Sequence, residues 1–174
     1  MFSDSPFIRH NTDGSLDVRV IVAFRKLTEK DSFYMKLVSW WTKSNLVHSE
    51  VIIGNTWISI NNDTGFRINE LRPLTDKYEY IDIGYIKLLP YQLESIKNFI
   101  IDQKDKKYDY MGIILSQVIP INIQHDSKWF CSELCVKLLQ MLLIRDLNNF
   151  TPSRYSPADL YYKLKDLNFK EYEI

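Results

Sequence analysis

The sequence has few cysteines, few alanines and no excess of charge of either sign. Its 22 basic and 22 acidic side chains cancel, so no broad electrostatic field attracts nucleic acid, and we expect no nucleic-acid partner. Cysteine occurs only as Cys131 and Cys135. Two thiols four residues apart on a helix are badly placed for a disulfide and too few for a structural zinc site. We therefore expect free thiols, no metal and no cofactor.

Long hydrophobic runs are also missing. No apolar stretch reaches the length of a bilayer span, and the first 20 residues lack the basic start and apolar run of a signal peptide. We expect no transmembrane segment and no signal peptide. The scarcity of alanine beside plentiful Ile, Asn, Lys and Tyr is the usage of an AT-rich genome, such as that of a bacteriophage or a low-GC bacterium. The expected location is therefore the cytoplasm, or a virion or the host cytoplasm for a phage protein.

The chain is long enough for one sizeable core. A length of 174 residues with 45% hydrophobic residues predicts a single domain over residues 1–174. Residues 18–24 form a β-branched run typical of a buried strand, and helical spacing follows in residues 30–44, with Asp31 or Ser32 as N-cap. Short apolar runs between turn residues in 47–86 predict an antiparallel meander.

The C-terminal half has a helical pattern throughout. It predicts helices over residues 91–104 and 108–119, a cysteine-bearing helix that ends near Leu143, and a last helix over 156–167 with Ser156 as N-cap. Strand, helix, strands and then helices is the order of an α+β fold.

The sequence "KWFCSELCVKLLQ" raises the question of whether Cys131 is a nucleophile. A nucleophilic cysteine needs help to ionise at neutral pH, and a helix N-terminus is a common source of that help. Ser127 or Asp126 as N-cap would leave Cys131 about one turn inside the helix, where backbone amides could also hold an oxyanion. A lone cysteine on an amphipathic helix is more often a small buried hydrophobe, and we assign Cys135 to that role.

A cysteine hydrolase also needs a base, and the chain contains three histidines. His10 lies in a polar N-terminal segment, and His125 lies in the loop before the cysteine helix and stays an alternative. His48 is the better candidate because it interrupts the apolar strand "LVHSEVIIG". Residues two apart on a strand share a face, so Glu50 could orient His48 or stabilise its charged form. The alternative is a polar strand face that looks at water.

Four segments in a fixed order carry a family resemblance. A strand with "VHSEV", the strands of "TWISINNDTGFRI", a helix opening with "YDYMG" and a helix start at "KWFCSE" follow one another within residues 18–165. This arrangement resembles the circularly permuted members of the NlpC-type superfamily of papain-like cysteine peptidases and amidases. In the permuted members, as here, the histidine precedes the cysteine. The resemblance implies a permuted papain-like fold, with an antiparallel meander packed against helices that include the cysteine helix.

The resemblance also implies the roles of individual residues. Cys131 would be the nucleophile and His48 the general base. Permuted relatives often place an acidic residue a few positions before a glycine-aromatic or glycine-valine pair, and here that position holds Ser59. Because Ser59 cannot supply the charge, either Glu50 takes over the orienting role from the histidine's own strand or the base is held less well and the enzyme is slow; we favour Glu50.

The substrate-binding candidates are three side chains around these residues. Tyr108 belongs to the segment that relatives place beside the cleft, Trp129 precedes the cysteine, and Ser59 lies on the strand after the histidine. For Tyr108 and Trp129, packing is the alternative role, and Asp109 would complement the dipole of its helix.

The resemblance implies hydrolysis of an amide or ester bond. Peptidoglycan stem peptides are the commonest target of the superfamily, and permuted members are also linked to acyl or lipid-type substrates. One alternative is a weak or inactive member that serves as a virion component or binds a host protein. A plain binding module is another. A metal site formed by His48, Glu50 and Cys131 lacks the tight ligand cluster that would support it.

Overall fold

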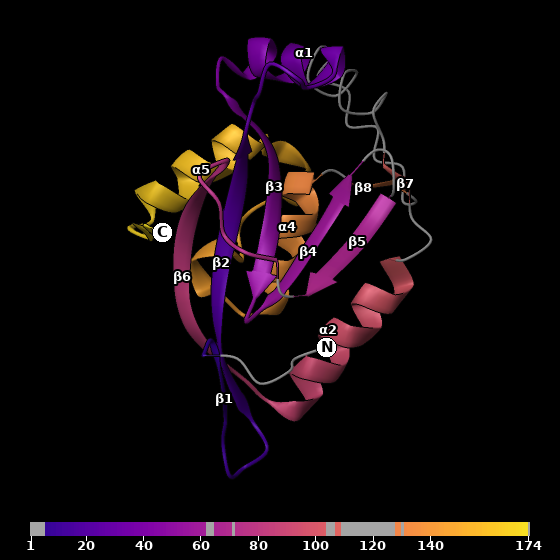
Figure 1. Ribbon diagram of the computed structural model, residues 1–174. Helices are drawn as coiled ribbons and strands as arrows, with labels where there is room; N and C mark the ends of the chain where they lie inside the picture. Colours follow the sequence, from indigo (N-terminus) through magenta and orange to yellow (C-terminus); the bar gives the residue numbers. More distant parts are fainter. Residues whose placement is uncertain are drawn as a thin grey trace.

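The computed structural model describes residues 6–61, 65–70, 72–103, 107–108, 128–129 and 131–173 (Figure 1). Its strands are β1 (Ile8–His10), β2 (Leu16–Lys26), β3 (Leu46–Ile53), β4 (Thr56–Asn61), β5 (Gly65–Glu70), β6 (Tyr78–Leu88), β7 (Lys107–Tyr108), β8 (Lys128–Trp129) and β9 (Lys170–Glu171). Its α-helices are α1 (Phe33–Thr42), α2 (Pro90–Gln103), α4 (Cys131–Met141) and α5 (Pro157–Asp166), with short 3-10 helices at Arg145–Leu147 and Pro152–Arg154. The expected α+β class is confirmed.

The described strands form a seven-stranded antiparallel sheet and a separate two-stranded pair. The order across the sheet is β5, β4, β3, β2, β6 and β9, with β1 also paired to β2. The predicted meander over residues 47–86 is therefore right for β3 to β5 and wrong for β6. β6 crosses to β2 because these two strands of equal length pair along almost their whole extent, from Leu16 opposite Leu88 to Arg25 opposite Tyr78.

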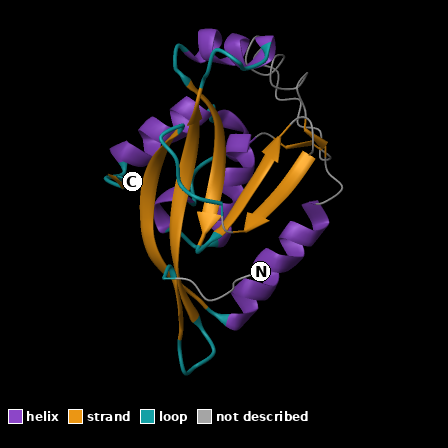
Figure 2. Ribbon diagram, viewed as in Figure 1, coloured by secondary structure: helices purple, strands orange, loops and turns teal. Residues whose placement is uncertain are grey.

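The two faces of the sheet have different coverings. Alternate residues of β2, including Val20 and Val22, point toward α4 and α5 and join the main core with Leu138 and Leu164. Figure 2 shows these helices behind the strands. The other face carries a smaller cluster, composed of Ile21, Ala23, Ile52, Trp57, Tyr78 and Tyr80. This second face is rich in aromatic rings with polar ends, and such rings can both pack and donate hydrogen bonds.

β3 and β4 share a tight hairpin and then diverge. Gly54 has a φ of 61° at the first position of the two-residue turn, a conformation that favours glycine. The strands pair over only three positions, from Ile53 opposite Thr56 to Val51 opposite Ile58, after which β4 continues beside β5 alone. α4 contacts both strands, and Figure 1 shows them separating away from the hairpin. The first half of β3 therefore pairs with none of the described strands on that side.

The helix predictions agree with the structure in most places. Ser32 caps α1 by accepting from the Met35 amide, and Ser156 forms a capping box with Asp159 at the start of α5. The predicted caps of the cysteine helix, Ser127 and Asp126, lie outside the described residues, but the prediction that Cys131 lies one turn inside the helix is wrong. Lys128–Trp129 are extended and pair with β7, so α4 begins only at Cys131.

Other predictions concern short or undescribed segments. Tyr108, expected to open a helix, lies in β7, and the remainder of that predicted helix falls outside the described residues. His125 and Asp109 lie outside them as well. Within the described chain, no helix combines the length and apolarity that crossing a membrane requires.

Candidate active site

His48 and Cys131 meet where β3 and β4 diverge. Cys131 is the first residue of α4, and His48 lies near the start of β3, directly opposite Arg25 of β2. A register shift between Arg25 and Lys26 accommodates one extra residue of β3 next to this position. The two side chains lie close enough for Cys131 to affect the pKa of His48. Residues far apart in the sequence are thus brought together by the packing of a helix end against a strand.

Both partners are buried. His48 is 5% exposed and Cys131 is 3% exposed, so the alternative of a polar strand face that looks at water is wrong for this strand. Burial lowers the pKa of His48, but the charge attraction and hydrogen bond to Cys131, together with the charge of Glu50, outweigh burial and the repulsion by Arg25. The pKa of His48 is therefore raised above its usual value.

Glu50 lies beside His48, as the strand pattern predicts, but its closest partners are elsewhere. The Nε2 atom of His48 is 3.9 Å from Oε1 of Glu50, which is beyond hydrogen-bond distance. Nη1 of Arg72 donates to both Glu50 oxygens at 3.3 and 3.1 Å, and the hydroxyl of Tyr78 donates to Oε1 at 2.8 Å. Glu50 therefore acts on His48 through its charge, and its position is fixed by Arg72 and Tyr78.

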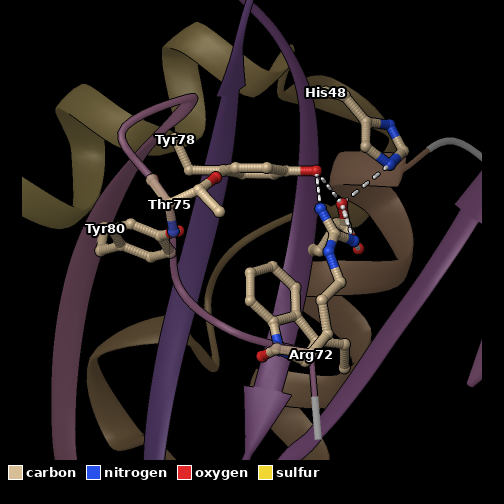
Figure 3. Close-up of polar contacts among 7 residues, drawn as sticks. His48, Arg72, Thr75, Tyr78 and Tyr80 are labelled. Atoms are coloured by element: carbon tan, nitrogen blue, oxygen red, sulfur yellow. Dashed lines mark hydrogen bonds and ion pairs between the residues drawn. The ribbon is translucent and has the colours of Figure 1, made fainter. Parts of the chain in front are cut away.

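The Arg72 side chain is held by aromatic residues of the second face. Its guanidinium lies 4.3 Å from the Trp57 ring centre and 5.0 Å from that of Tyr78, and it donates to the Tyr78 hydroxyl. Figure 3 shows Arg72, Tyr78 and His48 converging on one point. Burial, the charge of Glu50 and its hydrogen bond raise the pKa of Tyr78 to about 12, against the opposing effect of Arg72. Tyr78 thus stays a hydrogen-bond donor at neutral pH.

The loop that carries Arg72 is itself anchored to the sheet. Nε1 of Trp57 donates to the carbonyl oxygen of Arg72 at 2.9 Å. The hydroxyl of Tyr80 donates to the Thr75 carbonyl at 3.0 Å and accepts from the Thr75 amide at 2.8 Å (Figure 3). These bonds fix the backbone of the loop, and so they hold the Arg72 guanidinium against Glu50.

A pocket of about 540 Å³ opens beside His48 and Glu50. Its described lining consists of Arg25, Met35, His48, Glu50, Ser59, Arg67, Asn69, Arg72 and Tyr78. Cys131 is not among these lining residues. The volume is that of a small-molecule or peptide subsite.

Cys135 has a different environment from Cys131. It lies one turn further along α4, is 1% exposed and donates from Sγ to the Ser49 hydroxyl at 3.4 Å. Burial raises its pKa well above the usual value, despite the opposing bond to Ser49. The predicted packing role of Cys135 is confirmed.

The substrate-binding candidates are placed in two groups. Ser59 lies on β4 opposite Arg67, is buried and lines the pocket. Tyr108 and Trp129 pair with each other in the parallel strands β7 and β8, and β7 lies against β5. Of the other histidines, His10 lies exposed on β1, opposite Leu16 at the far end of β2 from Arg25.

Six residues of the described pocket lining were not predicted from the sequence: Arg25, Met35, Arg67, Asn69, Arg72 and Tyr78. Arg25 could have been found, because it directly follows a predicted strand that must pair with the histidine strand. Arg72 and Tyr78 carried no signal, because "LRPLTDKYEY" has the pattern of a loop and the start of a strand, and only the crossing of β6 to β2 brings Tyr78 to Glu50.

Comparison of the chain with models of known protein families, with curated proteins and with solved structures finds no significant match. The chemistry of the site must therefore be argued from its own residues. Among the described residues, no group of three or more His, Cys, Asp or Glu side chains is arranged to hold a metal ion.

Proposed function

We propose that the protein is a cysteine hydrolase that cleaves an amide or ester bond with Cys131 as nucleophile and His48 as general acid and base. The observation that carries this proposal is the burial of Cys131, the first residue of α4, beside His48, whose pKa is raised in part by Cys131. The diverging sheet edge that receives the cysteine helix supports the resemblance to a permuted papain-like fold. Peptide, peptidoglycan and acyl substrates all contain the bond that such a pair can cleave.

The proposed reaction has two stages. In the first, the Cys131 thiolate adds to the substrate carbonyl carbon, the bond to the leaving nitrogen or oxygen breaks, and protonated His48 gives its proton to the leaving group. In the second, His48 takes a proton from water, hydroxide adds to the thioester carbon, and the acid product leaves with the thiolate restored.

The start of α4 and the charge of Glu50 support these steps. The first turn of a helix directs backbone N–H groups toward its N-terminal end, where they can stabilise an oxyanion. The Glu50 carboxylate stabilises His48 in its charged form, which is the form that protonates the leaving group. In this proposal Glu50 is a positioning and electrostatic residue, held by Arg72 and Tyr78.

The test is the pH dependence of alkylation of Cys131 by iodoacetamide, with Cys135 as internal control and mass spectrometry as readout. In the proposed pair, a charged His48 favours the thiolate, so Cys131 should react at pH values below the usual thiol pKa of about 8.5. The raised pKa of Cys135 should leave it inert over the same range.

Two histidine variants complete this experiment. His48→Ala should move the Cys131 profile back toward that of an ordinary thiol, whereas His10→Ala, on the exposed strand β1, should leave it unchanged. Equal reactivity of the two cysteines in the wild type, with no effect of His48→Ala, would remove the proposed mechanism.

The second candidate is an inactive member that serves as a virion component or binds a host protein. The 3% exposure of Cys131 and its absence from the described pocket lining favour this candidate. It predicts that Cys131 resists alkylation at every pH at which the fold is intact. The experiment above therefore separates the two functions.

A further inference from the structure

The described lining of the pocket beside His48 contains more positive than negative side chains. Arg25, Arg67 and Arg72 belong to it, against the single described carboxylate of Glu50. The chain as a whole carries no net charge, so this local excess is a property of the pocket and not of the composition.

The three arginines differ in what already binds them. Arg25 forms an ion pair with Asp31, and Arg72 forms one with Glu50. The side chain of Arg67 is exposed and makes no ion pair or hydrogen bond with the described residues. Each guanidinium has five N–H donors, so Arg25 and Arg72 also keep donors beyond those used by their carboxylates.

The strand register places neutral donors around Arg67. Arg67 and Asn69 project from the same side of β5, while Phe66 and Ile68, on the opposite side, pack against the main core. Ser59 lies directly opposite Arg67 on β4. A planar guanidinium flanked by a hydroxyl and a carboxamide is suited to bind two oxygens of a carboxylate or phosphate.

We propose that this pocket binds an anionic group of the substrate, a carboxylate or phosphate, with Arg67 as its main cation and Ser59 and Asn69 as further donors. This inference rests on the proposed function, because the anion belongs to the acyl compound that Cys131 attacks next to His48. Arg25, directly opposite His48 in the sheet, extends the positive lining toward the reacting bond. The pocket thereby selects acidic over neutral substrates of equal size.

Binding is measured in Cys131→Ala protein, so that turnover plays no part. The probes are N-acetylglutamic acid 1-amide and N-acetylglutamine amide, which differ only by a side-chain carboxylate or carboxamide, and calorimetry at low salt gives both dissociation constants. The acidic probe should bind about tenfold more tightly or better, as expected for one charge-assisted pair. Inorganic phosphate, titrated in the same way, tests the other source of the anion.

Three arginine variants test the assignment. Arg67→Gln should abolish most of the preference for the anion, and Arg67→Lys should keep part of it. Arg154→Gln, which removes an exposed arginine outside the pocket lining, should leave the preference unchanged. If binding of the carboxylate probe or of phosphate depends on Arg67, the proposal is supported, and the probe that shows this dependence identifies which anion the pocket binds. Equal binding of the two amide probes together with Arg67-independent binding of phosphate would overturn it.

These experiments distinguish failure of the proposed anion site from failure of the proposed hydrolase function. Arg67-dependent binding by a protein whose wild type shows no reactive Cys131 would refute the hydrolase alone. Hydrolysis of acidic and neutral substrates at equal rates, unchanged by Arg67→Gln, would refute the anion site alone.

Discussion

The first and second turns of α4 each present one cysteine to β3, and the two thiols have opposite chemical surroundings. Cys131 and Cys135 are both almost fully buried. Cys131 meets an imidazole at the helix N-terminus, whereas Cys135 meets the neutral hydroxyl of Ser49. Two thiols buried to the same degree on one helix therefore meet different partners on the facing strand. On β3 these partners alternate because successive side chains point to opposite sides of the sheet.

The largest difference between the two cysteines should appear in the hydrolysis rates of variants that each lack one thiol. With a substrate of the proposed hydrolase, Cys131→Ala should lower kcat/KM by roughly a thousandfold or more, because the proposed mechanism places the acyl intermediate on this sulfur. Cys135→Ala should change it by less than about threefold, since that thiol stays protonated. Initial rates with ester and anilide substrates measure both. Similar losses in the two variants would contradict the distinction between the two turns.

Glu50→Gln should have a smaller effect than removal of Cys131. This single substitution changes the electrostatic surroundings of both thiols. Loss of its negative charge lowers the pKa of His48, whose raised value depends partly on Glu50, and also removes a charge that raises the pKa of Cys135. Each unit by which the His48 pKa falls should cost the charged pair about tenfold in population. The alkylation profile of Cys131 should therefore move to higher pH.

The control for Glu50→Gln is Glu79→Gln, which removes a strand glutamate that pairs with Lys26. It should leave the profile of Cys131 where it is in the wild type. An unchanged profile in Glu50→Gln would show that Arg72 and Tyr78 screen the Glu50 charge from His48.

The smallest effect is expected in the free energy of unfolding. Cys135→Ala removes a buried sulfur in the core of α4 and its bond to Ser49, which should destabilise the protein by about 1 to 2 kcal/mol. Urea unfolding followed by tryptophan fluorescence gives this value. A loss below the error of the extrapolation would mean that Cys135 contributes neither packing nor a useful hydrogen bond.

Local sequence was sufficient for most elements. Ser32 and Ser156 mark the starts of α1 and α5 because a short polar side chain before an apolar helical pattern satisfies backbone donors without tertiary help. The start of α4 at Cys131 was not predictable in the same way. The extended residues Lys128 and Trp129 pair with β7, a partner from another part of the chain, and this pairing delays the start of the helix.

The sequence by itself determined the α+β class, the free cysteines, and which residue types could act as nucleophile, base and carboxylate. Period-two alternation is enough to place His48 and Glu50 on one face of β3, because side-chain direction on a strand is a local property. Only the tertiary structure decided what those side chains meet. Crossing of β6 to β2 gave Glu50 its Tyr78 and Arg72 partners, and divergence of β4 from β3 let the end of α4 reach His48. These contacts join distant segments through strand order and packing, which no local pattern specifies.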